Sequence, residues 1–145
     1  MVRKQNIENY KTESKGFDIL EKNLPNFYVP TNDEKKYILD LLGIDHVYSR
    51  TFDGIILNVK SVKDIKNFTD FTMIEVKTTK AKMKNFPNKF FFGMSQNEES
   101  FLKIFRGNYL MCLVHITQRK FKLFDFEELE KMIHNKRTLY AINIK

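Results

Sequence analysis

Short apolar runs alternate with helix-start signals along most of this chain, and the alternation limits the folds open to it. The start signal is a Thr, Ser or Asp followed three residues later by Glu, as in 31–34, 95–98 and 125–128. In such a capping box each side chain accepts a hydrogen bond from the other residue's backbone N–H. We therefore expect a helix to begin at each of these places.

Apolar residues at helical spacing follow each signal, as a helix packed on a core requires. Gly43 is placed to end the first of these helices and Gly107 the second. Before them, residues 1–23 are polar with few apolar positions, which predicts a docked helix or an arm. Pro25 and Pro30 bracket an extended connector.

The remaining apolar runs have the length and composition of strands. These runs are 46–52, 55–59, 71–77, 90–94, 109–116, 120–124 and 139–144. A polar loop, 60–70, separates the second from the third, which we expect to pair. The resulting order, α-β-β-β-β-α-β-β-α-β, predicts an α/β (α+β) fold with a central mixed β-sheet flanked by helices.

At 145 residues the chain has the usual size of one domain. We expect residues 1–30 to form the N-terminal arm or docked helix and residues 31–145 the main domain. Hydrophobic residues make up 42%, which argues against intrinsic disorder. No apolar run reaches the roughly 18 residues of a membrane span, and no secretory signal is recognisable, so we expect no membrane association and a cytoplasmic location.

The chain is basic, with 25 Lys and Arg against 18 Asp and Glu, a formal charge of +7. Such a balance favours polyanions, meaning nucleic acid or an anionic membrane surface. Between Val76 and Asn97 there is no acidic residue, and this stretch carries Lys77, Lys80, Lys82, Lys84 and Lys89. Two interpretations stay open, a solvated lysine-rich loop and a surface that contacts phosphates.

Thiol and zinc chemistry are not indicated. The single cysteine, Cys112, cannot form an internal disulfide and lies in an apolar run, as a small core residue does. The three histidines, His46, His115 and His134, lack the spacing of zinc ligands.

The residues that indicate chemistry are Asp53 and the triplet Glu75-Val76-Lys77. Residues i and i+2 of a strand project from one face, so Glu75 and Lys77 are expected to point together while Val76 enters the core. Asp53, at the start of a paired strand, can reach the same place. Two carboxylates and an ammonium on an apolar sheet are costly unless something binds between them, and Mg²⁺ suits such oxygen ligands.

Simpler interpretations exist for the same residues. Asp53-Gly54 is a common turn pair, and Glu75 with Lys77 can form a solvated strand face. Against the second interpretation, the run 71–77 is the most apolar in the first half of the chain, which predicts a central strand.

The set Asp53…Glu75-Val76-Lys77 resembles the active-site motif of the PD-(D/E)XK, or restriction-endonuclease-like, nuclease superfamily. The order of elements around it fits, and Ser95-Gln96-Asn97-Glu98 followed by Tyr109 resembles the Mrr-like and DUF3883-like branches. The resemblance spans residues 31–116. One departure is that Phe52 stands where the family often has proline.

The resemblance implies a restriction-endonuclease-like core in which Asp53, Glu75 and the Val76 backbone hold Mg²⁺, with Mn²⁺ as a substitute, and Lys77 is the catalytic lysine. It also makes Glu34 a candidate metal ligand. Glu98, or Gln96 beside it, is a candidate for contacting phosphate or water. Helix capping alone would also account for a glutamate at position 34 and at position 98.

Candidate phosphate contacts are Arg50, Lys80, Lys82 and Lys84. The expected function is therefore a Mg²⁺-dependent DNA endonuclease of restriction or defence type. The alternatives are a structure-selective nuclease of Holliday-junction-resolvase type and a non-catalytic DNA-binding domain or subunit with a nuclease fold, and RNA stays open as a substrate. Beside DNA, the expected partner is a second copy or a separate recognition subunit, because cutting both strands needs two sites.

Overall fold

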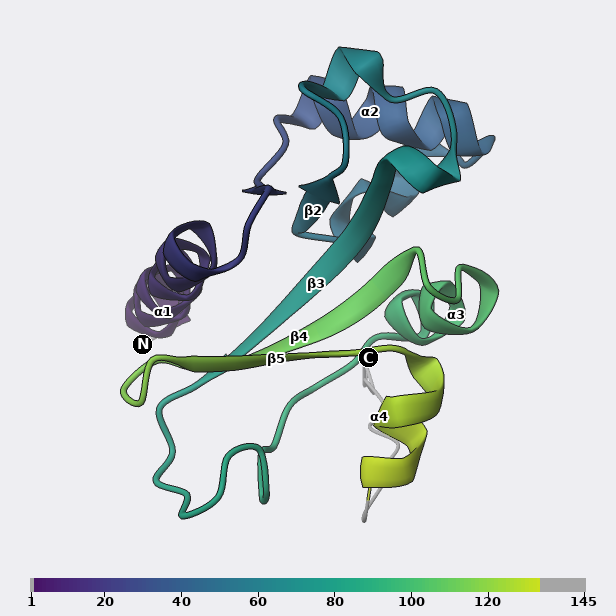
Figure 1. Ribbon diagram of the computed structural model, residues 1–145. Helices are drawn as coiled ribbons and strands as arrows, with labels where there is room; N and C mark the ends of the chain where they lie inside the picture. Colours follow the sequence, from purple (N-terminus) through teal and green to yellow (C-terminus); the bar gives the residue numbers. More distant parts are fainter. Residues whose placement is uncertain (1, 134–145) are drawn as a thin grey trace, which may run out of the picture.

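The computed structural model describes the backbone of residues 2–133 and the side chains of residues 12–133. Within this range the strands form one five-stranded mixed sheet in chain order (Figure 1). The strands are β1 (Phe27–Tyr28), β2 (Gly54–Leu57), β3 (Phe71–Thr79), β4 (Tyr109–His115) and β5 (Lys120–Phe124). Only the β3–β4 pair is parallel; the other neighbours are antiparallel. The predicted α+β class with a central mixed sheet is confirmed, and the expected strand 139–144 lies outside the described residues.

The three helices expected from capping boxes are present as α2 (Asn32–Leu42), α3 (Gln96–Ile104) and α4 (Phe126–Met132). Thr31, Ser95 and Asp125 each form the complete reciprocal box. Gly43 ends α2 in the left-handed conformation, at φ 70°, which glycine adopts without steric cost. α3 ends at Phe105, slightly earlier than Gly107 suggests.

The N-terminal segment forms α1 (Val2–Asn23), whose C-terminal half packs against the sheet (Figure 1). Ile19 and Leu20 are buried, and they pack with the β3 and β4 residues of one face. Gly16 permits the close approach, because a Cβ at this position would lie 2.7 Å from Thr78 Cγ2. The docked-helix alternative for this segment is therefore the one observed.

The sheet has an apolar core on each face, which follows from the two-residue period of a strand. Ile74 and Val76 of β3 lie in the core under α1. Phe71 and Met73 lie in the core on the opposite face, with residues of α2, α3 and α4. β3 is paired on both sides, so its prediction as a central strand is confirmed.

Two expected strands are wrong. Residues 46–51 form a 3₁₀ helix, η1 (His46–Thr51), because the Asp45 side chain accepts a hydrogen bond from Val47 N and starts a turn. Residues 90–94 lie in the loop that joins β3 to α3, where Phe90 N donates to Pro87 O. Instead of joining the sheet, Phe90 and Phe92 of this run pack against each other and against the core that contains Phe71 and Met73.

The connection 60–70 is not a plain polar loop. It contains two 3₁₀ turns, η2 (Val62–Asp64) and η3 (Phe68–Asp70), and it buries Val62 and Ile65 in the core. In the part of the chain that the structure describes, no helix combines the length and apolar character needed to cross a bilayer.

Candidate active site

The predicted residues meet where β3 extends beyond its neighbour β2. The β2–β3 pairing stops at Gly54 opposite Ile74, so no strand of the described residues lies on that edge of residues 75–79. Asp53 occupies the edge instead, and its Oδ2 accepts a hydrogen bond from Val76 N at 2.9 Å. The sequence-based expectation that Asp53 reaches the Glu75–Lys77 segment thus agrees with the geometry.

Contacts on both sides of Asp53 determine its position. Its backbone N–H donates to Ile74 O at 2.9 Å, as a continuation of the β2–β3 ladder. Just before it, Phe52 is fully buried, and Thr51 O accepts a hydrogen bond from the buried Tyr109 hydroxyl. A carboxylate held by core packing on one side and a sheet ladder on the other is well preorganised.

Asp53, Glu75 and Lys77 together form what we call the acidic cluster, and Glu75 is its most unusual group. Only 5% of the residue is exposed, and its Oε2 is a buried atom with no hydrogen-bond partner among the described residues. Burial, followed by the negative charge of Asp53, a side-chain hydrogen bond with Asp53 and the charge of Glu98, raises the pKa of Glu75 to about 11, although Lys77 opposes the shift. A buried carboxyl oxygen without a partner costs free energy unless a ligand satisfies it.

Lys77 lies between two carboxylates, as its place two residues after Glu75 predicts. Its Nζ is 3.0 Å from Glu98 Oε1 and 3.2 Å from Oε2, and 3.8 Å from Glu75 Oε1. Glu98 comes from the first turn of α3, where its Oε1 also accepts a hydrogen bond from Ser95 N. The capping role expected for Glu98 is confirmed, and the same side chain also orients the lysine.

Sequence analysis did not identify Glu13 of α1, which the fold places beside the cluster. It lies one helical turn before Gly16, where α1 approaches β3. Burial and the charge of Asp53 raise the pKa of Glu13, while Lys77 and Lys35 lower it. Glu13 therefore belongs to the electrostatic environment of Asp53 and Lys77.

A sequence signal for Glu13 exists, although a weak one. Glu13, Gly16 and Leu20 recur at helical spacing, so they share the face of α1 that packs on the sheet. A carboxylate on a packed helix face requires a polar or charged neighbour. The neighbour itself becomes known only from the tertiary structure.

The structure does not bring Glu34 into this cluster. Its Oε1 accepts hydrogen bonds from Thr31 N at 2.9 Å and from the Tyr28 hydroxyl at 2.7 Å, on the exposed side of α2. The predicted phosphate contacts are all exposed, but on separate elements. Arg50 lies on η1, whereas the other three lie just after β3: Lys80, Lys82 and Lys84.

The oxygen atoms at the β3 edge suit a magnesium ion in the way the resemblance implies. Val76 donates its N–H toward Asp53, and in a strand the carbonyl of the same residue faces the same edge. Glu75 adds its unpartnered oxygen. Among the side chains of residues 12–133, no three from His, Cys, Asp or Glu lie close enough together to hold a metal ion by themselves. Mg²⁺ is commonly held by one or two carboxylates, with water and phosphate completing its coordination.

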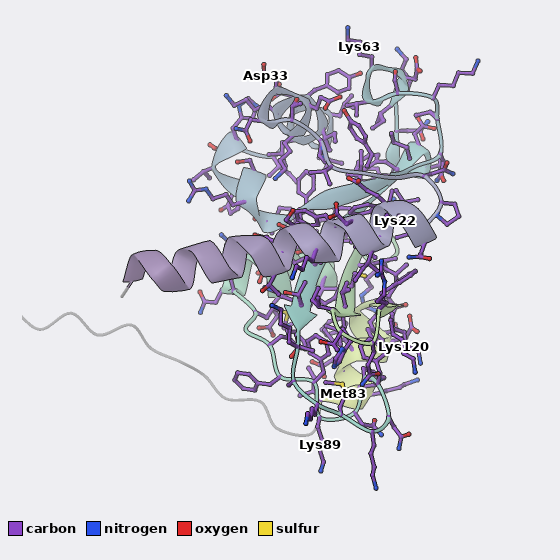
Figure 2. The ribbon with its side chains drawn as sticks, turned by 90° about the vertical axis from the view of Figure 1, so that its left-hand side faces the viewer. Lys22, Asp33, Lys63, Met83, Lys89 and Lys120 are labelled. Atoms are coloured by element: carbon purple, nitrogen blue, oxygen red, sulfur yellow. The ribbon has the colours of Figure 1, made fainter. Side chains whose placement is uncertain are left out.

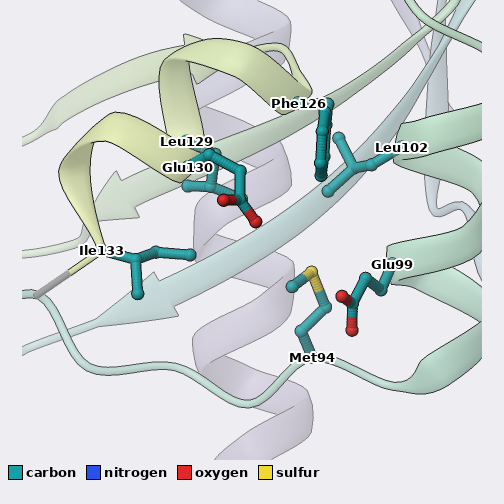
Figure 3. A pocket seen from close by; sticks show the side chains of 7 residues that line it. All are labelled: Met94, Glu99, Leu102, Phe126, Leu129, Glu130 and Ile133. Carbon is teal, nitrogen blue, oxygen red and sulfur yellow. The ribbon is translucent and has the colours of Figure 1, made fainter. Parts of the chain in front are cut away.

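A small pocket between α3 and α4 is separate from this site. Figure 3 shows the side chains around it, including Met94, Leu102 and Phe126, none of which belongs to the acidic cluster. Its volume is about 10 Å³, room for about one water molecule. The pocket is therefore no candidate for a nucleotide or cofactor.

A second hollow, open to solvent, lies between α1 and the β4–β5 turn and has a volume of about 340 Å³. Lys15, Lys22 and Arg119 line it together with a single acidic residue, Asp18. These cations extend the basic surface beyond the stretch 77–89 that the sequence indicated.

Comparison of the chain with models of known families, with curated proteins and with solved structures yields no match.

Proposed function

We propose that this protein is a Mg²⁺-dependent nuclease that hydrolyses phosphodiester bonds in DNA. The observation that carries the proposal is the buried, unpartnered Oε2 of Glu75, beside Asp53 and an ammonium group. A cation that binds at this position would explain why a buried carboxyl oxygen has no hydrogen-bond partner. A substrate phosphate supplies the remaining ligands.

In this proposal Asp53, Glu75 and the Val76 carbonyl hold the metal ion. When bound, Mg²⁺ neutralises charge that develops on the phosphate oxygens. Asp53 also keeps the β3 edge in place through its bond to Val76 N. Glu75 enters the reactive state deprotonated, because a metal ligand must lose its proton.

Lys77 orients the attacking water and stabilises negative charge near the phosphorus. Its Nζ is anchored by Glu98 at 3.0 Å and directed toward Glu75 at 3.8 Å. A cation that is already in position stabilises the negative charge that develops in the transition state. Glu98 is a positioning residue in this scheme, since it acts through Lys77.

The test is cleavage of supercoiled plasmid and of a four-way junction, each with Mg²⁺ and with EDTA. Asp53→Asn and Lys77→Ala are the active-site variants. Their matched controls are Asp33→Asn and Lys63→Ala, which change the same residue types at exposed positions, at the end of the molecule opposite Lys89 and Met83 (Figure 2).

We expect metal-dependent cutting by the wild type and both controls, and a loss of about 100-fold or more in both active-site variants. Circular dichroism must show that the variants remain folded. Cutting that persists in EDTA, or active-site variants as active as their controls, would contradict the proposal. Salt-sensitive DNA binding without any cleavage would favour the non-catalytic alternative.

A further inference from the structure

The loop 80–95, which joins β3 to α3, presents one phenylalanine to solvent. Phe91 is 82% exposed, although both of its neighbours are partly buried. Phe90 packs edge-on against Phe86, with ring centroids 6.1 Å apart, and against Phe92 at 6.0 Å. The packing of the flanking rings leaves Phe91 as the aromatic ring of the loop that faces outward.

Specific contacts hold this loop on the sheet. His115 Nδ1 accepts a hydrogen bond from Gln118 N, so its Nε2 carries the proton donated to Ala81 O at 2.7 Å. Gln118 Nε2 donates to Met83 O at 2.9 Å. The Phe86 ring packs edge-on against the His115 ring, at 6.4 Å. An anchored ring loses less conformational entropy when it binds a ligand than a ring on an unattached segment.

All charged residues of the loop that carries Phe91 are lysines. The loop carries four exposed lysines and no acidic residue: Lys80, Lys82, Lys84 and Lys89. Figure 2 shows Lys89 and Met83 together at the end of the molecule opposite Asp33 and Lys63. An exposed aromatic ring among lysines matches a ligand with both anionic groups and flat apolar faces, which describes a nucleic-acid strand.

Both ends of the loop are connected to the candidate active site. Lys80 directly follows β3, three residues after Lys77. At the other end, Ser95 N donates to Glu98 Oε1 at 2.8 Å, and Glu98 is the ion-pair partner of Lys77. A nucleic-acid strand that binds along this loop therefore extends toward Lys77.

We infer that Phe91 is a stacking platform for an unpaired base and that the neighbouring lysines bind the adjoining phosphates. In an intact duplex the bases present only their edges in the grooves. The face of a phenyl ring can stack on a base that is unpaired and unstacked. The preferred ligand is thus DNA with single-stranded character. That such DNA is also cut rests on the proposed function, whereas the stacking does not.

The test measures binding in EDTA, so that no cleavage interferes. The probe is a single-stranded oligodeoxynucleotide with a fluorescent adenine analogue whose emission falls on stacking; the comparison is the same sequence as a blunt duplex. The variants are Phe91→Ala and Phe91→Tyr. Ile104→Ala is the control, since Ile104 is 69% exposed and lies at the far end of α3.

We expect Phe91→Ala to weaken single-strand binding about tenfold or more and to abolish the quenching. Phe91→Tyr, which keeps the ring, stays within about twofold of wild type, as does Ile104→Ala. Duplex binding changes by less than about twofold, because the lysines alone contact it. Melting curves show whether each variant is folded.

Equal losses on duplex and single strand, or an unchanged single-strand affinity in Phe91→Ala, would overturn the inference. If binding to anionic lipid vesicles depends on Phe91 and the oligonucleotide probe is not quenched, the loop binds a membrane surface and the inference is wrong. A protein that quenches the probe yet cuts nothing contradicts only the nuclease proposal. A protein that cuts DNA while Phe91→Ala quenches normally contradicts only this inference.

Discussion

The carboxylate of Asp53 replaces a strand at the open edge of β3, since its Oδ2 accepts the hydrogen bond of Val76 N at 2.9 Å. β2 ends its pairing at Gly54, one residue after Asp53, so this N–H has no partner in the ladder. A residue proposed as a metal ligand therefore also has a structural role, and the two roles can be separated by experiment.

Asp53→Ala is expected to destabilise the metal-free protein by about 1–3 kcal/mol, because it leaves a partly buried N–H of Val76 unpaired. Asp53→Asn keeps an oxygen acceptor at the same position, so its free energy of unfolding changes by less than about 1 kcal/mol. Urea unfolding at neutral pH in EDTA measures both. Equal losses in the two variants would show that the bond to Val76 contributes little.

The buried carboxyl of Glu75 makes the stability of the metal-free protein depend on pH. Its pKa is raised from 4.5 to about 11, so the folded state retains a proton that the unfolded chain releases. The stabilisation is complete below about pH 4.5 and is lost progressively as the pH rises toward about 11. We expect a loss of roughly 1–3 kcal/mol between about pH 5 and pH 8.

Glu75→Gln, which mimics the protonated carboxyl, tests this pH dependence. The variant should be more stable than wild type at pH 8, and its stability should vary less with pH. Unfolding by urea at several pH values measures the slope. A slope unchanged by Glu75→Gln would assign the pH dependence to another group.

Mg²⁺ should stabilise the wild type at pH 8, because binding to the folded state alone raises the free energy of unfolding. A melting temperature higher by a few degrees is expected at saturating metal. Glu75→Gln should lose this increase, since its amide is a poorer ligand than a carboxylate. Glu34→Gln should keep it, because Glu34 accepts its hydrogen bonds within the α2 cap. An increase that Glu34→Gln abolishes would place the metal near α2.

The contact between α1 and β3 predicts that Gly16→Ala changes the free energy of unfolding in opposite directions in two backgrounds. Gly16→Ala gains about 1 kcal/mol of helix propensity, but the new Cβ would lie 2.7 Å from Thr78 Cγ2, a stiff β-branched methyl. We expect a net destabilisation of about 1 kcal/mol in wild type. In a Thr78→Ser background, where the methyl is absent, the same change should stabilise. Urea unfolding of wild type, the two single variants and the double variant measures the coupling between the two changes. If Gly16→Ala changes stability in the same direction in both backgrounds, the close approach of Gly16 to Thr78 is contradicted.

Much of the fold followed from patterns that act within one turn or one strand. The capping boxes beginning at Thr31, Ser95 and Asp125 predicted three helices, since both partners of each box lie three residues apart. The two-residue period of β3 placed Glu75 and Lys77 on one face, and pairing with the preceding strand brought Asp53 to them. The candidate site could be assembled from the sequence to this extent.

Other features were decided only by tertiary structure, because they depend on which surfaces are already occupied. The apolar run 90–94 forms no strand, because Phe90 and Phe92 pack on each other and on the core beneath the loop instead. Glu34 stays in its cap, whereas Glu98, in a capping box of the same kind, reaches Lys77. Where each helix packs decides which neighbours its glutamate meets. The same reason applies to Glu13, whose neighbours are set by the docking of α1 at Gly16, a contact between distant segments that no local pattern encodes.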